Sequence, residues 1–189
     1  EAGYTVDDFT DITWDEYIEK GKDILAKTGK PLLSCVSGES DVITMMLQST
    51  GASLFDDEGN PDMVDNEALK KVMETYQELI QTGVMVEVND WDQYVGTLTN
   101  STVAGTINGC WIMGSIQTAE DQSGKWTITN MPKMEGVDGA TNYSNNGGSS
   151  WAITSNCKNV ELAEDFMAST FAGSVEFYET ILPSSGALA

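Results

Sequence analysis

Segments with helical periodicity alternate along this chain with isolated short apolar runs, and no other feature restricts the possible folds as strongly. Helical segments begin behind Thr13, near Ser40 or Asp41, at Asn66, behind Asp90 and behind Asn159. The apolar runs lie at residues 32–36, 103–107, 126–131 and 151–153. Isolated strands that alternate with helices are typical of α/β domains, so we predict an α/β fold in which these runs are strands.

Three of the helical segments carry an apolar stripe, which predicts a buried face. Behind Thr13, which forms a capping box with Glu16, the stripe consists of Trp14, Tyr17, Ile18, Gly21, Ile24 and Leu25. The helix of residues 66–82 is predicted to bury Leu69, Val72, Met73, Tyr76, Leu79 and Ile80. The last long helix is predicted to bury Leu162, Ala163, Phe166, Met167 and Phe171.

The charge of the chain restricts its partners. Among 189 residues, 30 are acidic and nine are basic, which gives a formal net charge of −21. Nucleic acids and anionic membranes are bound through an excess of Lys and Arg, so we expect neither as a partner. A neutral ligand such as a sugar fits this charge, although the acidic residues can equally serve only to keep a secreted protein soluble.

Several kinds of site lack the residues that they need. The chain has no histidine, which excludes Ser-His-Asp and Cys-His nucleophiles and His-ligated metals. Cys35, Cys110 and Cys157 form no Cys-x-x-Cys pair, so at least one thiol has no intramolecular partner, and we expect all three to be small buried apolar residues. The acidic turn of residues 56–61 lacks the calcium-loop pattern of an EF-hand. We therefore predict no metal, no cofactor and no catalytic residue.

Four motifs carry a resemblance to a known family. They are Thr13–Trp14–Asp15–Glu16–Tyr17, Thr106–Ile107–Asn108–Gly109–Cys110–Trp111, the stretch from Gly147 to Ile153, and the capped helix within Asn156–Phe166. In this order the chain resembles the second lobe of the maltose-binding-protein family, the sugar receptors of bacterial importers. The resemblance implies a type II periplasmic-binding-protein lobe with a short mixed sheet flanked by helices. It also implies one lobe over residues 1–189, with the first lobe and the closing helices outside this chain.

The same resemblance implies a function. A neutral mono- or oligosaccharide is expected to bind between two lobes, which then close and present the ligand to the permease of an ATP-binding-cassette importer. The receptor is expected to be a monomer outside the cytoplasm, as a lipoprotein or a periplasmic protein, with its export signal outside this chain. It is expected not to be an enzyme.

Eight residues are predicted to contact the ligand. They are Trp111, Trp91, Glu39, Asp41, Asn108, Gly147, Gly148 and Ser149. Trp111 and Trp91 are expected to cover the C–H faces of sugar rings. Glu39 or Asp41 is expected to bond hydroxyl groups.

Each of these assignments has a structural alternative. Trp111 can instead anchor a helix in the core, and Trp91 can be ordinary surface. One of the two carboxylates can simply cap a helix, and the stretch from Gly147 to Ser149 can be a plain turn.

Two other classes of function remain as alternatives. A glycoside-processing enzyme needs two carboxyl groups that face the scissile bond. No feature of the sequence singles out such a pair, and no Gly-x-Ser-x-Gly motif is present. A surface module that binds other proteins would show no saccharide binding.

Overall fold

Two parallel strands, β1 (Leu33–Val36) and β2 (Met85–Val88), form the sheet around which the helices gather in the computed structural model, which describes residues 1–185. Leu33 pairs with Met85, and Val36 pairs with Val88. Parallel strands require a long crossover connection, and two helices lie in it here. The α/β class is thereby confirmed, whereas the sheet in the described residues is parallel and not mixed.

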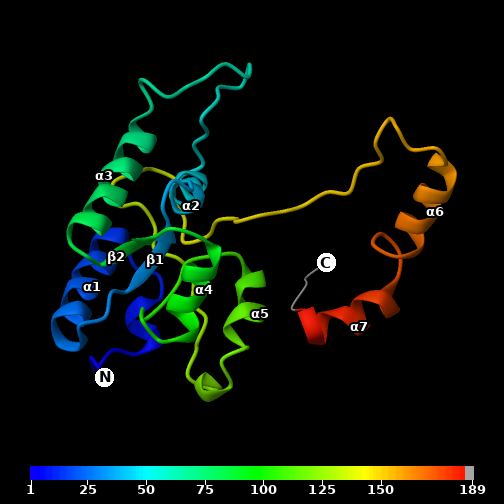
Figure 1. The fold of residues 1–189 in the computed structure, drawn as a ribbon. Helices are drawn as coiled ribbons and strands as arrows, with labels where there is room; N and C mark the ends of the chain where they lie inside the picture. Colours follow the sequence, from blue (N-terminus) through cyan, green and yellow to red (C-terminus); the bar gives the residue numbers. More distant parts are fainter. Residues whose placement is uncertain (186–189) are drawn as a thin grey trace.

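The helices of the first part of the chain, up to residue 116, lie around this sheet, whereas the last two helices lie apart from it (Figure 1). The α-helices are α1 (Trp14–Thr28), α2 (Asp41–Ser49), α3 (Glu67–Gln81), α4 (Trp91–Thr99), α5 (Met113–Ile116), α6 (Val160–Ser169) and α7 (Val175–Ser185). Three short 3-10 helices are η1 (Val6–Phe9), η2 (Cys110–Ile112) and η3 (Glu120–Gln122). In the described part of the chain, no helix is long and apolar enough to cross a membrane.

Side-chain caps fix where four of the helices begin. The Thr13 hydroxyl accepts a bond from the Glu16 amide at 3.2 Å, and Glu16 accepts from the Thr13 amide at 2.8 Å, which confirms the capping box. Asn66, Asp90 and Asn159 cap α3, α4 and α6, each with a side-chain oxygen that accepts from the backbone amide three residues further on. Because caps are local, these starts could be predicted from a few residues each.

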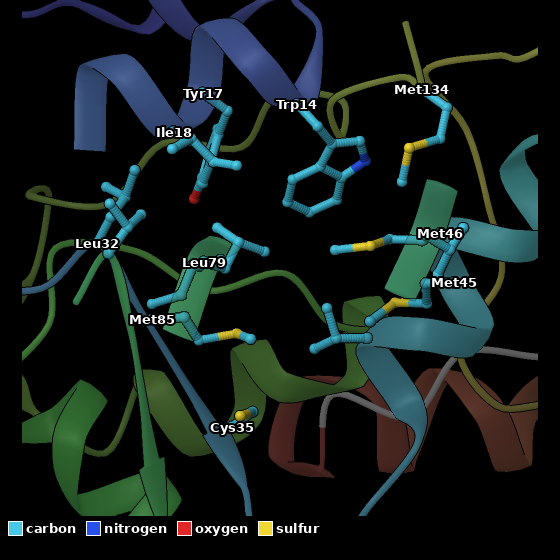
Figure 2. Packing of buried hydrophobic residues seen from close by; sticks show 14 of the residues in the cluster. Trp14, Tyr17, Ile18, Leu32, Cys35, Met45, Met46, Leu79, Met85 and Met134 are labelled. Atoms are coloured by element: carbon cyan, nitrogen blue, oxygen red, sulfur yellow. The ribbon is translucent and has the colours of Figure 1, made fainter. Parts of the chain in front are cut away.

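The main core lies between α1, α2, α3 and the sheet. Trp14 is fully buried, and Figure 2 shows Met46 of α2 reaching toward its ring. The cluster also contains Tyr17, Ile18, Ile24, Leu32, Leu33, Cys35, Met45, Val72, Leu79, Val84, Met85 and Met134. The predicted buried faces of α1 and α3 are therefore largely confirmed, with the exception of Met73, which is 47% exposed.

A second, smaller core lies under α4. Tyr94 and Leu98 of α4 pack there with Val103 and Ile112. Trp126 and three strand residues, Val36, Val86 and Val88, cover this cluster partly. α4 is thus held rigidly over the sheet, and its first residue projects beyond the end of β2.

Three of the four predicted strands are not strands in the described structure. Residues 104 and 105 each donate one backbone bond, to Pro31 and Leu32, but the pairing stops there. Residue 133 makes an isolated bridge to Thr13, and residues 126–131 and 151–153 are irregular. A strand needs a partner for its N–H and C=O groups, and within residues 1–185 none of these three runs forms a continuous ladder with a second segment.

Residues 151–185, which we call the arm, lie apart from residues 1–146, which we call the body (Figure 1). None of the five residues on the predicted inner face of α6 is buried: Leu162 is 63% and Phe166 is 58% exposed, and Ala163, Met167 and Phe171 are half-buried. Trp151 stacks on Phe171 at 4.3 Å, but the Trp151 ring is still 65% exposed. The expectation of a buried face on α6 is therefore wrong within the described residues, because the body does not reach it.

The three cysteines differ in burial, so the expectation that all are buried is wrong for two of them. Cys35 is buried, Cys110 is exposed and Cys157 is half-buried, and all three are free thiols. Burial raises the pKa of the Cys35 thiol, so this side chain is a neutral packing group at physiological pH.

Candidate ligand-binding site

Three segments of the body end at the same edge of the sheet. β1 leads through residues 37–40 into Asp41, and β2 leads through Asn89 and Asp90 into Trp91. The segment whose residues 104 and 105 bond to the backbone just before β1 leads through Asn108 and Gly109 into Trp111. Because the carboxyl ends of parallel strands share one edge, these three segments converge there, at the usual ligand position of open α/β sheets.

Two exposed tryptophan rings form the apolar part of this site. Trp91 is 43% exposed and Trp111 is 39% exposed, with their ring centroids 5.6 Å apart and their planes tilted by 39°. Trp91 also lies 5.4 Å from the ring of Tyr94, which is buried beneath it. We call Trp91, Trp111 and Tyr94 the aromatic platform.

A chain of hydrogen bonds runs along this platform. The Tyr94 hydroxyl and the Thr106 hydroxyl share a bond of 2.6 Å, and the Asn108 amide donates to the Tyr94 hydroxyl at 2.9 Å. The Asn146 amide donates to Asn108 Oδ1 at 2.6 Å and also lies 3.4 Å from Asp41 Oδ2. The site therefore places amides, hydroxyls and one carboxylate beside exposed aromatic surface.

The Tyr94 hydroxyl, which takes part in these hydrogen bonds, is neutral. Burial raises its pKa, while the bonds from Thr106 and Asn108 oppose the rise. The hydroxyl consequently keeps its proton at physiological pH and can both donate and accept.

Glycines allow the backbone to come close to the Trp111 ring. A Cβ atom on Gly109 would overlap the Trp111 side chain and the Asn146 carbonyl oxygen. Gly147 and Gly148 have φ values of +110° and +96°, which side-chain-bearing residues rarely adopt. The prediction that backbone approaches the site closely at Gly147 fits this geometry.

The structure brings together five of the eight predicted ligand residues. Trp111, Trp91, Asn108, Asp41 and Gly147 lie in or against the platform and its hydrogen bonds. Glu39 lies exposed in the loop before α2, and its side chain makes no hydrogen bond within residues 1–185. Gly148 and Ser149 follow Gly147 on the way out of the body.

Three residues of the site were not predicted as site residues. Tyr94 lies on the predicted short helix behind Asp90, and its ring is buried, but its hydroxyl reaches the polar chain. Thr106 and Asn146 join through contacts between distant segments, for which the sequence has no periodic signal. The one sequence feature that could have indicated Asn146 as a site residue is its position directly before Gly147–Gly148.

The structure offers few groups for metal binding or catalysis at this edge. In the part of the chain that the structure describes, no three Cys, Asp or Glu side chains are placed to hold a metal ion. The acidic turn after α2 uses its Asp56 carboxylate to accept bonds from the amides of Glu58 and Asn60. The carboxylate beside the platform is Asp41, which accepts a hydrogen bond from the Asn146 amide.

A separate open groove of about 430 Å³ lies against α3, and it differs in chemistry from the platform. Its walls are Glu67, Ala68, Lys70, Lys71, Glu74, Glu135, Gly136, Val137 and Asp138. None of these wall residues is aromatic, whereas the platform offers ring faces. Sugar C–H faces prefer an aromatic surface, so the platform is the better candidate.

Comparison with known proteins gives a consistent result. A family model described as bacterial extracellular solute-binding protein matches residues 4–180. The lactose-binding protein of Rhizobium radiobacter is 34% identical over 188 residues, which cover 100% of this chain and 44% of that protein. The arabinooligosaccharide-binding protein of Halalkalibacterium halodurans is 27% identical over 174 residues, or 89% of this chain and 38% of that protein.

Solved structures show the same fold. The GacH receptor of Streptomyces glaucescens, whose structures include complexes with acarbose, superimposes with a TM-score of 0.77 at 16% identity, over 99% of this chain and 47% of the receptor. A solute-binding protein of an ABC transporter from Thermotoga lettingae, bound with α-D-tagatose, gives a TM-score of 0.73 at 21% identity, over 99% of this chain and 48% of that protein. The chain thus spans less than half the length of the proteins that it matches.

Proposed function

This chain belongs to the family of bacterial extracellular solute-binding proteins, and from that premise we propose that it is the ligand-binding lobe of a carbohydrate receptor for an ATP-binding-cassette importer. The ligand is a neutral mono- or oligosaccharide that lies against the aromatic platform. The receptor delivers it to the importer's permease and performs no chemistry on it. It acts as a monomer, held outside the cytoplasm as a lipoprotein or in the periplasm.

The observation that carries this proposal is the pairing of exposed rings with a chain of polar groups. Trp111 and Trp91 present ring faces with centroids 5.6 Å apart, and Asn108, Asn146 and Asp41 lie beside them. A sugar has C–H faces that prefer aromatic surface, and it has hydroxyls that must be paired once they leave water. The relatives named for lactose and arabinooligosaccharides support a saccharide as the ligand class.

The domain arrangement is part of the proposal. The expected lobe spans residues 1–189, and we now propose that residues 1–146 alone form the second lobe, because they contain both apolar clusters and expose the platform at an open edge. The exposed apolar side chains of α6 support the view that the arm packs on a part of the receptor outside this chain. We expect the isolated chain to bind sugar more weakly than the whole receptor, because half of the contacts are missing.

The test is a titration of the full-length receptor with mono- and oligosaccharides, including lactose and arabinooligosaccharides, followed by calorimetry. We expect saturable binding, and we expect Trp111→Ala to weaken it by about tenfold or more, because the ring contributes on the order of 1 kcal/mol beyond its burial. Phe55→Ala is the matched control, since this exposed ring lies in the connection between α2 and α3.

Other outcomes would favour the alternatives. Unchanged affinity in the Trp111→Ala receptor would place the sugar elsewhere. Hydrolysis of a glycoside by the wild-type receptor would favour an enzyme, and a complete lack of saccharide binding at millimolar concentration would favour a protein-interaction module.

A further inference from the structure

The chain leaves the body beside the aromatic platform, and the change from bonded to unbonded backbone takes place within three residues. Up to that point it is fastened to the body: the Thr141 amide donates to the Ser49 carbonyl at 2.8 Å, and the Ser144 hydroxyl donates to the Met45 carbonyl at 2.7 Å. Between residues 148 and 159, by contrast, no hydrogen bond joins the chain to the body. The boundary between fastened and free chain therefore falls at Asn146–Gly148, which we call the connector.

The connector can change direction without loss of packing. Gly147 and Gly148 both have positive φ values, and neither carries a side chain that must be repacked when the backbone rotates. Hinges are typically a few such residues at the end of an element, where φ and ψ can absorb a movement of one part against another.

Asn146 links this connector directly to Trp111. The indole N–H of Trp111 donates to the Asn146 carbonyl at 3.1 Å, while the Asn146 side chain is bonded to Asn108 and Asp41. Gly109 leaves no room between the two, because a Cβ atom there would overlap both the Trp111 ring and the Asn146 carbonyl oxygen. The ring cannot keep this hydrogen bond if the carbonyl turns away.

We propose that Asn146 is a positioning residue that couples the orientation of the Trp111 ring to the direction of the connector. This inference rests on the proposed function, because it makes the sugar platform sensitive to the position of the arm. When the connector rotates, the Asn146 carbonyl moves and the ring loses its fixed orientation. By reciprocity, a sugar ring stacked on Trp111 stabilises the connector direction in which the bond is made.

The first experiment reads the hydrogen bond itself in the full-length receptor without sugar. The indole N–H resonance of Trp111 is assigned by its loss in Trp111→Phe, and its hydrogen exchange rate is then measured. Asn146→Ala frees the connector from Asn108 and Asp41, so we expect about tenfold faster exchange at Trp111, in line with the loss of one such bond. The indole of Trp14, buried in the main core, should not change. Asn130→Ala is the control, since this amide bonds to Asp11 instead.

The second experiment separates positioning from general stability. Asn108→Ala combined with Asn146→Ala should speed hydrogen exchange at the Trp111 indole no more than the faster single variant, because both substitutions break the same link. Gly148→Ala strains the connector without touching Trp111, because Gly148 has a positive φ value and a Cβ atom there would meet nothing within 4 Å. We expect it to shift the Trp111 resonance and to lower sugar affinity several-fold. Unchanged exchange at Trp111 in Asn146→Ala, or an unchanged Trp111 resonance in Gly148→Ala, would overturn the coupling. A receptor that shows the expected exchange but binds no sugar would instead contradict the proposed function alone.

Discussion

Tryptophan has two different environments in this molecule, and its place within an element decides which one it takes. Trp14 begins α1 against the core and is fully buried, and its indole nitrogen is the one buried side-chain N or O atom without a hydrogen-bond partner in residues 1–185. Trp91 begins α4 beyond the end of β2, and Trp111 lies in η2, so both rings stay exposed. A ring that follows the carboxyl end of a strand faces the open edge, whereas a ring on the stripe of an amphipathic helix is buried.

Gly21 gives a prediction at the same scale, because it is the point of closest approach between α1 and the segment before β2. A Cβ atom there would overlap the Val84 side chain, whereas at Gly96 in α4 the nearest atom would be Asn100 Nδ2 at 3.7 Å. We expect Gly21→Ala to lower the free energy of unfolding by about 1–3 kcal/mol through overpacking. Gly96→Ala should raise it by about 0.5–1 kcal/mol through its higher helix propensity. Urea denaturation followed by circular dichroism measures both, and shifts of the same sign would contradict this account.

At the scale of elements, what could be predicted from the sequence is what short stretches determine. The starts of α1, α4 and α6 follow from single capping residues, and the buried stripe of α3 follows from its period. The strands predicted at 103–107, 126–131 and 151–153 depend on partner segments far away in the chain, and an apolar run alone cannot reveal whether a partner exists.

The same distinction applies to the candidate site. Trp111 and Asp41 could be proposed because each lies where a predicted strand gives way to a helix and because the motifs around them resemble the family, and Trp91 could be proposed from its matching position and its acidic neighbours. The links of Asn146 to Asn108 and Trp111 join residues that are 38 and 35 positions apart. No local pattern predicts such contacts, and this is why Asn146, Tyr94 and Thr106 were missed.

The capping box of α1 predicts a measurable dependence of stability on pH. The amide and then the hydroxyl of Thr13 hold the pKa of Glu16 below its usual value of 4.5. Because the folded-state pKa is depressed, the stabilisation is present above about pH 4.5 and is lost as the pH falls through the folded-state value. Glu16→Gln removes this titration, so we expect it to destabilise the chain near pH 7 by at most about 1 kcal/mol, the usual range for a cap.

The free energy of unfolding must be compared between wild type and Glu16→Gln, since other carboxylates titrate in the same pH range. The difference in free energy of unfolding between wild type and Glu16→Gln should shrink between about pH 5 and about pH 3. A difference that grows toward low pH would show that the Glu16 carboxylate does not act through this cap.

At the scale of the whole molecule, the arm predicts that the isolated chain exposes apolar surface. Val160, Leu162, Phe166 and Val175 are between 47% and 72% exposed, on helices that the body does not cover. Exposed apolar side chains in such number are typical of an interface, and in solution they bind the dye ANS or other copies of the chain. We expect the isolated chain to bind ANS strongly and a variant that ends at Asn146 to bind it weakly.

The body should keep its structure in that truncation, because both of its apolar clusters consist of residues before position 147. Near-ultraviolet circular dichroism of the buried Trp14 is the readout for this. Equal dye binding by both chains, or loss of the Trp14 signal in the shorter one, would show that the arm and the body form one cooperative unit.

The net charge of −21 leads to a prediction about the ligand. A charged ligand would feel this field over about 10 Å at moderate ionic strength, and salt would change its affinity strongly. A neutral sugar is held by ring contacts and short hydrogen bonds, which salt barely screens. We therefore expect the affinity of the full-length receptor for its sugar to vary by less than about twofold between about 20 mM and about 500 mM sodium chloride, as measured by calorimetry. A tenfold loss over that range would identify a cationic ligand, and a tenfold gain an anionic one, because salt weakens the attraction of the acidic surface for the first and its repulsion of the second.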